Sequence, residues 1–186
     1  MAKYKIIALV GEAGSGKDTI MKKVLEQSPQ LHEIVSCTTR PPREGEIDGI
    51  NYHFMSPEVF GDKVLHGEML EASCFNNWFY GTGYESLRSD CDNIGVFNPE
   101  GIESLLAHPG VEVAVYYILA SEKNRLLRQL NRETNPDVHE IIRRFKADLI
   151  DFENLDFPHY TLPNDTQEDL ENAVTFLVEA IKFRAD

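Results

Sequence analysis

The sequence predicts an α/β fold in which a parallel β-sheet is flanked by helices, and three observations carry this prediction. Two continuous apolar runs, residues 5–10 and 111–119, are typical of strands buried on both faces. Segments with apolar residues at helical spacing lie between and after these runs, so strands and helices alternate along the chain. The chain has 186 residues, of which 42% are hydrophobic and 26% are charged, which suffices for one domain with its own core.

The elements are expected in a simple order. The first strand, residues 5–10, is followed by a helix over residues 18–26, whose apolar side chains form one stripe. Residues 94–97 form a short strand that a nearby proline stops, and residues 111–119 form a longer strand. Residues 170–181 have apolar side chains at helical spacing, which predicts a helix lying on the core.

The middle of the chain has a different texture. Between residues 36 and 54, arginines and glutamates alternate with prolines and glycines, followed by short strand-like pieces. This predicts a smaller, mostly β lobe inserted after the first strand and helix. A second polar stretch, residues 124–137, predicts a mobile helical flap. The single domain is thus expected to have three parts: a core (about residues 1–34, 86–122 and 156–186), the smaller lobe (about 35–85) and a lid (about 123–155).

Charge and composition exclude several functional classes. The chain carries 18 Lys and Arg against 31 Asp and Glu, a formal net charge of −13, which disfavours binding to nucleic acid polymers. No apolar run is long enough to span a membrane, and the first residues lack the apolar segment of a signal peptide. The three cysteines suit neither a disulfide framework nor a zinc site. A cytoplasmic protein is expected.

A glycine-rich segment between the first strand and the first helix predicts a phosphate-binding loop. Glycines allow successive backbone N–H groups to point at one centre, and the helix N-terminus adds its dipole. Lys17 supplies a mobile cation to the terminal phosphates of a nucleotide. This motif specifies a P-loop NTPase type of parallel sheet and an ATP site made of residues Gly11, Ala13, Gly14, Ser15, Gly16, Lys17, Asp18 and Thr19.

One position of the loop departs from the usual pattern. The residue after the lysine is normally Ser or Thr, whose hydroxyl reaches a magnesium ion, whereas here it is Asp18, followed by Thr19. Mg²⁺ is still expected, held by the nucleotide's phosphates and by water. Asp18 and Thr19 are the two candidates for a protein ligand, and the choice between them stays open.

A second motif covers residues 36–54 and reads Ser, Thr-Thr-Arg, Pro-Arg, Gly-Glu, Asp-Gly and Tyr-His-Phe. A further block follows at Leu70–Glu71 and Tyr80–Thr82. Together with the phosphate loop, these blocks closely resemble the guanylate kinase family. A looser match covers Arg128, Arg132, the pair Arg143 and Arg144, and residues 163–165, so the resemblance spans nearly the whole chain.

The resemblance implies a site for the phosphate of GMP, formed by Arg40, Arg43, Tyr52 and Tyr80. The chemistry is consistent, because guanidinium groups bind phosphate oxygens in bidentate fashion and phenolic hydroxyls can donate to the remaining oxygens. In the alternative interpretation, the two arginines pair with Glu44 and Glu46 on a solvated loop.

The resemblance also assigns contacts with the guanine base to Ser36, Glu71 and Thr82. An ionised carboxylate only accepts hydrogen bonds, and guanine offers two adjacent donors, whereas adenine would leave the buried charge unpaired. Ser36 and Thr82 can donate to the O6 acceptor. Asn98 stands where the family has an aspartate, so it can bind ribose or base by hydrogen bonds but adds no charge to a metal site.

The family's lid arginines close over the phosphates, and this role falls to Arg128, Arg132 and one of Arg143 and Arg144. The apolar neighbours of Arg144 favour that residue, whereas an ungapped count from Arg132 favours Arg143. The expected catalytic set is therefore Lys17, Arg43, Arg128, Arg132 and Arg144. In the alternative interpretation, the arginines of this stretch lie on a helix surface and pair with Glu133, Glu140 or Asp148.

The resemblance implies an ATP-dependent kinase that phosphorylates GMP, and dGMP as well. A monomer or a homodimer is expected. One alternative is a nucleoside monophosphate kinase of different base or sugar range, or a ribose-phosphate kinase. Another is a binding module without catalytic activity that docks a phosphorylated protein segment. Lys17 and the three loop glycines argue against the module, and Glu71 with Ser36 argues against the ribose-phosphate enzyme.

Overall fold

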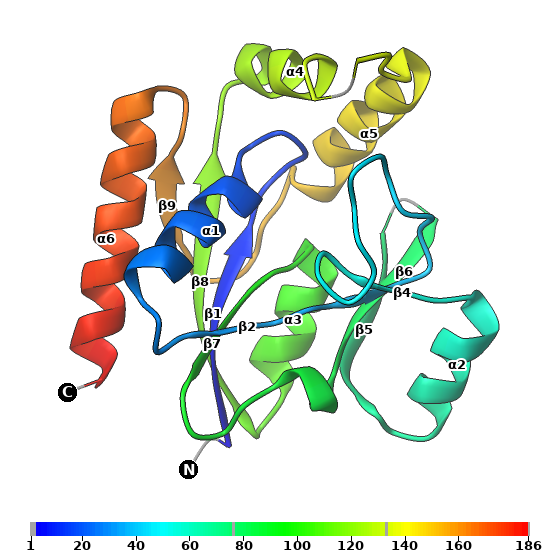
Figure 1. Ribbon diagram of the computed structural model, residues 1–186, viewed down its shortest axis with the longest axis vertical. Helices are drawn as coiled ribbons and strands as arrows, with labels where there is room; N and C mark the ends of the chain where they lie inside the picture. The colour runs from blue at the N-terminus through cyan, green and yellow to red at the C-terminus, as the bar shows by residue number, and fades with distance from the viewer. Residues whose placement is uncertain (1–2, 76, 133, 186) are drawn as a thin grey trace. The chain divides into compact units, whose positions relative to one another are not determined.

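The computed structural model describes residues 3–75, 77–132 and 134–185 and contains two β-sheets (Figure 1). The larger sheet has the strand order β2-β7-β1-β8-β9, and the smaller one has the order β4-β3-β6-β5. The strands of the larger sheet are β1 (Tyr4–Val10), β2 (His32–Glu33), β7 (Asp92–Val96), β8 (Val111–Leu119) and β9 (Tyr160–Pro163). The predicted α/β class with a parallel sheet is confirmed.

Strand pairing in the larger sheet follows from apolar sequences that can be buried on both faces. Strands β2 and β7 pair in parallel with His32 opposite Asn93, and β8 and β9 pair in parallel with Tyr116 opposite Tyr160. Nearly the whole of β1 is buried, and β8 has the bounds that its apolar run predicts.

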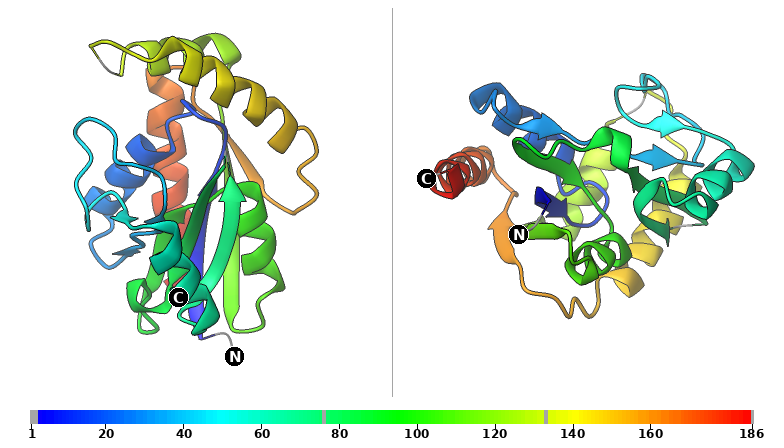
Figure 2. Two further views of the ribbon diagram at one scale, coloured as in Figure 1. Left: turned by 90° about the vertical axis from the view of Figure 1, so that its right-hand side faces the viewer. Right: turned by 90° about the horizontal axis from the view of Figure 1, so that it is seen from below.

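Three helices each follow a strand of the larger sheet in the sequence. They are α1 (Lys17–Gln27), α3 (Pro99–Ala107) and α6 (Gln167–Ala185). Helices α1 and α6 pack against each other, as Figure 2 also shows, through apolar residues such as Ile20 and Leu177. Both helices extend beyond the predicted bounds, because their exposed polar ends carry no apolar periodicity.

The smaller sheet forms the predicted β lobe. Its strands are β3 (Cys37–Thr38), β4 (His53–Phe54), β5 (Met69–Phe75) and β6 (Trp78–Gly83), and the helix α2 (Pro57–Leu65) and the short 3-10 helix η1 (Tyr84–Ser86) complete it. Strand β6 pairs antiparallel with β3 and β5, whereas β3 and β4 are parallel. The sheet is therefore mixed.

The predicted flap at residues 124–137 is only partly helical. Helix α4 (Glu122–Leu130) covers its first half, and α5 (Val138–Asp151) begins beyond its end. Pro136 has no N–H to donate, and the carboxylate of Asp137 accepts the backbone N–H of Glu140 as the N-cap of α5. These two residues separate the helices, which pack against each other.

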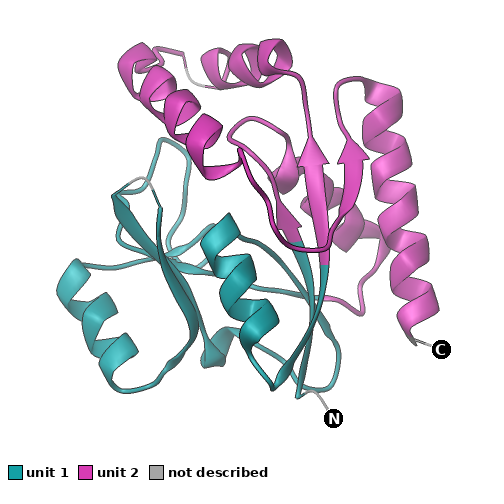
Figure 3. Ribbon diagram, turned by 180° about the vertical axis from the view of Figure 1, so that it is seen from behind, with its two compact units in different colours: residues 1–8, 32–114 teal, residues 9–31, 115–186 magenta. Residues whose placement is uncertain are grey.

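The chain divides into two compact units, coloured in Figure 3. The first unit contains residues 1–8 and 32–114, with a core that includes Ile94 and Ile102. The second contains residues 9–31 and 115–186, with a core that includes Ile118 and Leu177. The predicted boundaries of core, lobe and lid stay a prediction. Within the described ranges, no helix has the length and apolarity needed to cross a membrane.

Candidate functional site

The predicted phosphate loop lies in the second unit, between the end of β1 and the start of α1. Gly14 and Gly16 have φ angles of 82° and 98°, in the left-handed region that disfavours side chains. A Cβ atom on Gly14 would lie 2.5 Å from the backbone oxygen of Arg125, and one on Gly16 would clash with the side-chain amide of Asn164. The loop therefore needs glycine for its conformation and for its close neighbours.

Lys17 curls back over this loop. Its Nζ donates to the backbone oxygens of Gly11 and Glu12 at 2.6 and 3.1 Å, and lies 3.5 Å from the hydroxyl of Ser15. Burial lowers the pKa of the Lys17 amine, and the nearby acids, Asp18 first, partly offset this effect. The cation is thus held at the loop by groups that an anionic ligand can replace.

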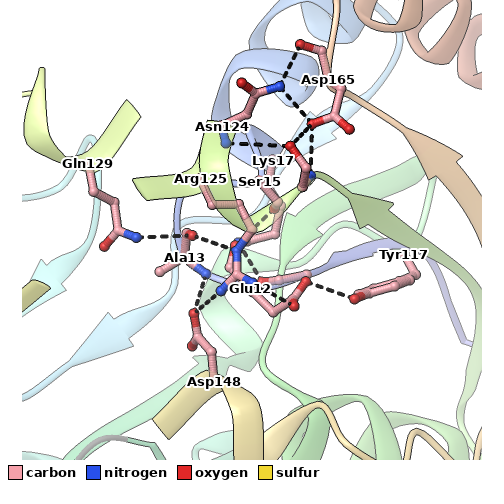
Figure 4. Close-up of polar contacts among 12 residues, drawn as sticks. Glu12, Ala13, Ser15, Lys17, Tyr117, Asn124, Arg125, Gln129, Asp148 and Asp165 are labelled. Carbon is pink, nitrogen blue, oxygen red and sulfur yellow. Dashed lines mark hydrogen bonds and ion pairs between the residues drawn. The ribbon is translucent and has the colours of Figure 1, made fainter. Parts of the chain in front are cut away.

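A buried ion-pair network lies beside the tip of the loop (Figure 4). Arg125, on α4, is 1% exposed and pairs with Glu12 at 2.8 Å and with Asp148, on α5, at 2.9 Å. Asp148 also accepts the backbone N–H of Ala13 at 2.8 Å, and the Nε of Arg125 donates to the backbone oxygen of Ala13 at 3.2 Å. Three charges therefore surround one residue of the loop.

Two neutral side chains extend the network. The hydroxyl of Tyr117 donates to Glu12 at 2.7 Å, and the amide nitrogen of Gln129 donates to the backbone oxygen of Ala13 at 3.3 Å. Burial raises the pKa of the Asp148 carboxyl, against the opposing effects of the Ala13 N–H, Lys17 and Arg125. Its Oδ1 and the Oε1 of Gln129 are buried and accept no hydrogen bond within the described part of the chain.

Arg128 also contacts the loop, as its predicted role requires, but it contacts the backbone. Its guanidinium donates to the backbone oxygens of Gly14 and Ser15 at 3.3 and 3.2 Å, and to that of Asn164 at 2.7 Å. The buried side chain of Asn164 donates to the same Ser15 oxygen at 2.7 Å. Asn164 belongs to the segment that gave the looser resemblance.

The other predicted lid arginines lie elsewhere on the two helices. Arg132 is exposed just beyond α4, and its backbone N–H donates to Gln129. Arg143 and Arg144 both pair with Glu140 of the same helix, at 2.7 and 3.0 Å. Because both arginines share this partner, the structure does not decide between them.

Asp18 and Thr19 are exposed in the first turn of α1. Both carry oxygen atoms, the ligand type that Mg²⁺ prefers. Within the described ranges, no group of three or more His, Cys, Asp or Glu residues could hold a metal ion. A magnesium ion at this position would therefore depend largely on phosphate and water.

The first unit brings together the two arginines predicted to hold a phosphate. Arg40 is 6% exposed and makes a bidentate pair with Glu46, at 2.9 and 3.1 Å. Glu46 also accepts the backbone N–H of Arg43 at 2.8 Å and lies 3.9 Å from its guanidinium. Burial disfavours the charge of Arg40, but Glu46 more than offsets it, so the pKa of Arg40 is raised. A carboxylate therefore occupies the arginine pair.

The two predicted tyrosines lie close to this pair. The ring centroids of Tyr52 and Tyr80 are 6.1 Å apart, and the guanidinium of Arg40 lies 5.3 Å from the centroid of Tyr52 and 5.6 Å from that of Phe54. The faces of aromatic rings attract a cation, and this attraction stabilises a guanidinium group that is shielded from water. Arg40, Tyr52 and Tyr80 thus form one compact cluster.

Glu71 lies opposite Thr82 in the pairing of β5 and β6. Its side chain is buried, with 7% exposure of the residue, and accepts the hydroxyl hydrogen of Thr82 at 2.7 Å. Burial raises the pKa of the Glu71 carboxyl to about 7, and the negative charge of Glu100 adds to this shift. Tyr80 and Thr82 alternate with Gly81 along β6, so they share one face of the sheet.

The first turn of α3 borders the same face. The side chain of Asn98 caps this helix by accepting the N–H of Gly101, and its amide donates to the hydroxyl of Ser73, both at 2.8 Å. A Cβ atom on Gly101 would lie 3.2 Å from the Oε2 of Glu71, so glycine leaves room for the carboxylate. Ser36 is buried just before β3, where its backbone oxygen accepts the N–H of His53.

The sequence analysis missed the ion-pair network. Arg125 lies in the polar stretch of residues 124–137, for which only a helical flap was predicted, and its partners Glu12 and Asp148 lie 113 and 23 positions away in the chain. The sequence did contain one indication of this network, because Glu12 directly follows the first loop glycine. An acidic residue next to a phosphate site needs a nearby cation.

The guanylate kinase family profile matches residues 3–182 of the chain. A curated guanylate kinase from Clostridium perfringens is 29% identical over 185 residues, covering 97% of this chain and 85% of that protein. One from Helicobacter hepaticus is 27% identical over 188 residues, covering 99% and 94%. The crystal structure of guanylate kinase from Anaplasma phagocytophilum has a TM-score of 0.74 at 22% identity, covering 98% of this chain and 87% of that one, and shows the same fold.

Proposed function

The chain belongs to the guanylate kinase family, and from this premise we propose that it transfers the γ-phosphoryl group of MgATP to GMP, and to dGMP, through the residues described above. GMP phosphorylation with ATP is the family's reaction. The predicted family, fold and enzyme class are confirmed, whereas the roles of single residues, the second acceptor and the metal are our proposals.

The loop of the second unit is proposed to bind the ATP phosphates. Its glycines leave backbone N–H groups near the N-terminus of α1, which is a favourable position for an anion. The amine of Lys17 would exchange the oxygens of Gly11 and Glu12 for phosphate oxygens. Asp18 or Thr19, with phosphate and water, would hold Mg²⁺, which supplies charge neutralisation at the transferred group.

The arginine and tyrosine cluster of the first unit is proposed to bind the phosphate of GMP. The bidentate geometry between Arg40 and Glu46 is the geometry that a phosphate uses. GMP would displace the carboxylate of Glu46 and gain hydroxyl contacts from Tyr52 and Tyr80. The salt bridge predicted as an alternative is present with Glu46, and we propose that the phosphate of GMP takes the place of this carboxylate.

Base selection is proposed to rest on Glu71, and its burial is the single observation that carries this assignment. The N1–H and 2-amino groups of guanine would donate to the carboxylate, while adenine would leave a buried charge without a donor. Because the pKa of Glu71 is about 7 before ligand binds, the two donors would also favour the ionised form. Ser36 and Thr82 are proposed to contact O6.

Asn98 is proposed to contact the ribose or the base of GMP. Its side-chain oxygen caps α3 and its amide nitrogen donates to Ser73, so it fixes the helix end beside Glu71. A side-chain amide has two donor hydrogens and two acceptor lone pairs, so it can contact the acceptor while keeping both bonds.

In the proposed reaction, an anionic phosphate oxygen of GMP attacks the γ-phosphorus of ATP while the bond to the β-phosphate oxygen breaks. No general base is required, because the attacking oxygen carries no proton to be removed. The residues position the two phosphates in line and stabilise the charge of the transferred group. Arg43, Arg128, Arg132 and one of Arg143 and Arg144 are proposed to contribute to this stabilisation.

The test is an assay that couples ADP release to an optical signal, with MgATP and each of GMP, dGMP, AMP, UMP and CMP. GMP should be the best acceptor. Glu71→Gln should lower kcat/KM for GMP by about 100-fold, because an NH₂ group replaces one of the carboxylate oxygens that accept from the base. Ser104→Ala, on the same unit, is the control. Faster turnover of AMP than of GMP by the unmodified protein would refute the base assignment.

The cytoplasmic location and the monomeric or homodimeric state stay predictions from the sequence. Size-exclusion chromatography with light scattering determines the second.

A further inference from the structure

The buried network around Ala13 has a function in the reaction that the family resemblance does not assign. We propose that Arg125 and Asp148 are positioning residues for the donor triphosphate. Arg125 holds the carbonyl group of Ala13, so that the following N–H points toward the phosphates, and Asp148 holds both Arg125 and the N–H of Ala13 in place. This inference rests on the proposed ATP site and concerns how that site is formed.

The geometry of the peptide bond links the direction of each carbonyl group to that of the next N–H group. In a planar trans peptide, the C=O of one residue and the N–H of the next point in opposite directions. Holding a carbonyl group in place therefore also fixes the direction of the following N–H. For a phosphate-binding loop, the direction of the N–H groups decides whether the ligand is bound.

The peptide between Ala13 and Gly14 is held most firmly. Its carbonyl oxygen accepts from the Nε of Arg125 and from the amide of Gln129. The preceding peptide is fixed as well, because its N–H donates to Asp148. With both backbone groups of Ala13 engaged, the N–H of Gly14 must point away from α4.

The next two carbonyl groups are held in the same way. Arg128 donates to the oxygens of Gly14 and Ser15, and Asn164 donates to the oxygen of Ser15. The N–H of Gly16 therefore points away from Asn164. Three successive carbonyl groups of the loop are thus held by side chains from α4 and from the segment after β9.

Arg125 is the centre of this arrangement. Its guanidinium binds Glu12, Asp148 and the Ala13 carbonyl at once, using three different nitrogen atoms. Gly14 permits the contact, because a side chain there would collide with the Arg125 backbone. A lysine has a single nitrogen and cannot reproduce this planar set of donors.

A buried ion-pair network is costly unless its geometry is well satisfied. Among the residues that the structure describes, the buried Oδ1 of Asp148 has no hydrogen-bond partner. Its other oxygen, Oδ2, serves both the Ala13 N–H and Arg125. The network thus fixes the orientation of two peptide units of the loop, at a cost in the free energy of folding.

The test compares Arg125→Lys and the double variant Arg125→Met/Asp148→Asn with the unmodified protein. Lys123→Met, which removes an exposed cation from the same helix, is the matched control. Binding of inorganic tripolyphosphate and of GMP is measured separately by calorimetry. Tripolyphosphate is the probe because it needs only the loop, without contacts to a base.

Both Arg125 variants should bind tripolyphosphate at least about 10-fold more weakly, since small misplacements of preorganised groups cost this much or more. Their affinity for GMP should stay within about twofold of the unmodified protein, and Lys123→Met should match it in both. In ¹⁵N spectra, the Gly14 and Gly16 amide signals should shift on tripolyphosphate addition in the unmodified protein and much less in Arg125→Lys. In turnover, KM for ATP should rise while KM for GMP stays constant.

Tripolyphosphate affinity unchanged in folded Arg125 variants would overturn the inference. So would a parallel loss of GMP and tripolyphosphate binding in Arg125→Lys, which would indicate a role in overall folding. The proposed function fails separately. Tripolyphosphate binding that depends on Arg125, in a protein that does not phosphorylate GMP, would refute the kinase and leave the positioning role intact.

Discussion

Two pairs of arginines, one in each unit, differ in whether they hold the main chain of the glycine-rich loop. In the first unit, Arg40 and Arg43 share the side chain of Glu46. In the second, Arg125 and Arg128 donate to backbone carbonyl groups of the loop, and Arg125 also pairs with the carboxylates of Glu12 and Asp148. The first pair shares a side-chain carboxylate that an incoming anion can replace, whereas the second pair contacts the main chain of the binding loop itself.

This difference separates two roles that a sequence motif cannot distinguish. An arginine paired with a replaceable carboxylate is available to a ligand phosphate, whereas one that holds carbonyl groups shapes the site for other donors. Arg128 was predicted from the resemblance to close over phosphates, and its contacts with backbone oxygens make it a support of the loop.

Lys17→Ala should lower kcat by about 1,000-fold, since it removes the one mobile cation of the loop that can follow the transferred phosphoryl group. Calorimetry should give an unchanged affinity for GMP, because Lys17 belongs to the second unit. Lys22→Ala, on the same helix, serves as the control. A mutant with more than a tenth of the original kcat would contradict the assignment of Lys17.

The affinity for GMP should fall about tenfold per pH unit as the pH decreases below about 7, the pKa of Glu71 before ligand binds. The protonated carboxyl cannot accept from both guanine donors, so each decrease in its ionised fraction weakens binding. GMP affinity is measured by calorimetry between pH 5.5 and 8.5. The phosphate of GMP also titrates, with a pKa near 6, and the Glu71→Gln variant retains only this contribution. Parallel pH profiles of the two proteins would contradict the prediction.

Arg40→Lys should raise KM for GMP by about 10-fold, because an ammonium group cannot bind phosphate in bidentate fashion or stack on Tyr52 in the same way. The affinity for tripolyphosphate should not change, in contrast with the Arg125 variants. Arg88→Lys, at an exposed position of the same unit, controls for the exchange of arginine for lysine. An equal rise in KM for ATP would show that the two sites are not separable in this way.

The last prediction concerns the effect of Glu71 on the free energy of unfolding. The folded-state pKa of Glu71 is raised from 4.5 to about 7, so the folded protein holds this proton more tightly than the unfolded chain. The resulting stabilisation is complete below pH 4.5 and is lost as the pH rises through 7. Glu71→Gln should therefore be more stable than the unmodified protein at pH 8 by roughly 1–3 kcal/mol, with no such advantage at pH 4.5. Urea denaturation at the two pH values measures this, and a pH-independent difference would argue against a buried ionisable group.

Much of the fold could be predicted from local patterns. The run Val111–Leu119 is apolar throughout and bounded by polar or turn residues, so its strand was placed without error. The flap was less predictable, because the end of α4 and the start of α5 depend on Pro136 and the Asp137 cap within one continuous polar stretch.

The residues of the candidate site likewise fall into those that local sequence patterns predict and those that depend on tertiary packing. Arg40 and Tyr52 belong to one contiguous motif, so their proximity could be predicted from the sequence, and the structure brings them together. Their role in binding GMP stays a prediction. The partners of Arg125 could not be predicted, since its bonds to Glu12 and Asp148 depend on how α4 and α5 pack. The engagement of Arg40 by Glu46 was considered as an alternative, but only the side-chain geometry shows that it is bidentate and buried.

The carboxylate of Glu46 bears on which phosphates the smaller lobe will accept. Any anion that binds Arg40 must expel a resident negative charge, so binding is an exchange of one ion for another. A terminal phosphomonoester carries up to about two charges near neutral pH and gains from this exchange. A phosphodiester carries a single charge and has fewer free oxygens, so it gains little over the glutamate it displaces. If Arg40 binds the acceptor phosphate as proposed, the lobe should therefore favour the end of a mononucleotide over the internal linkages of a polynucleotide, independently of the base.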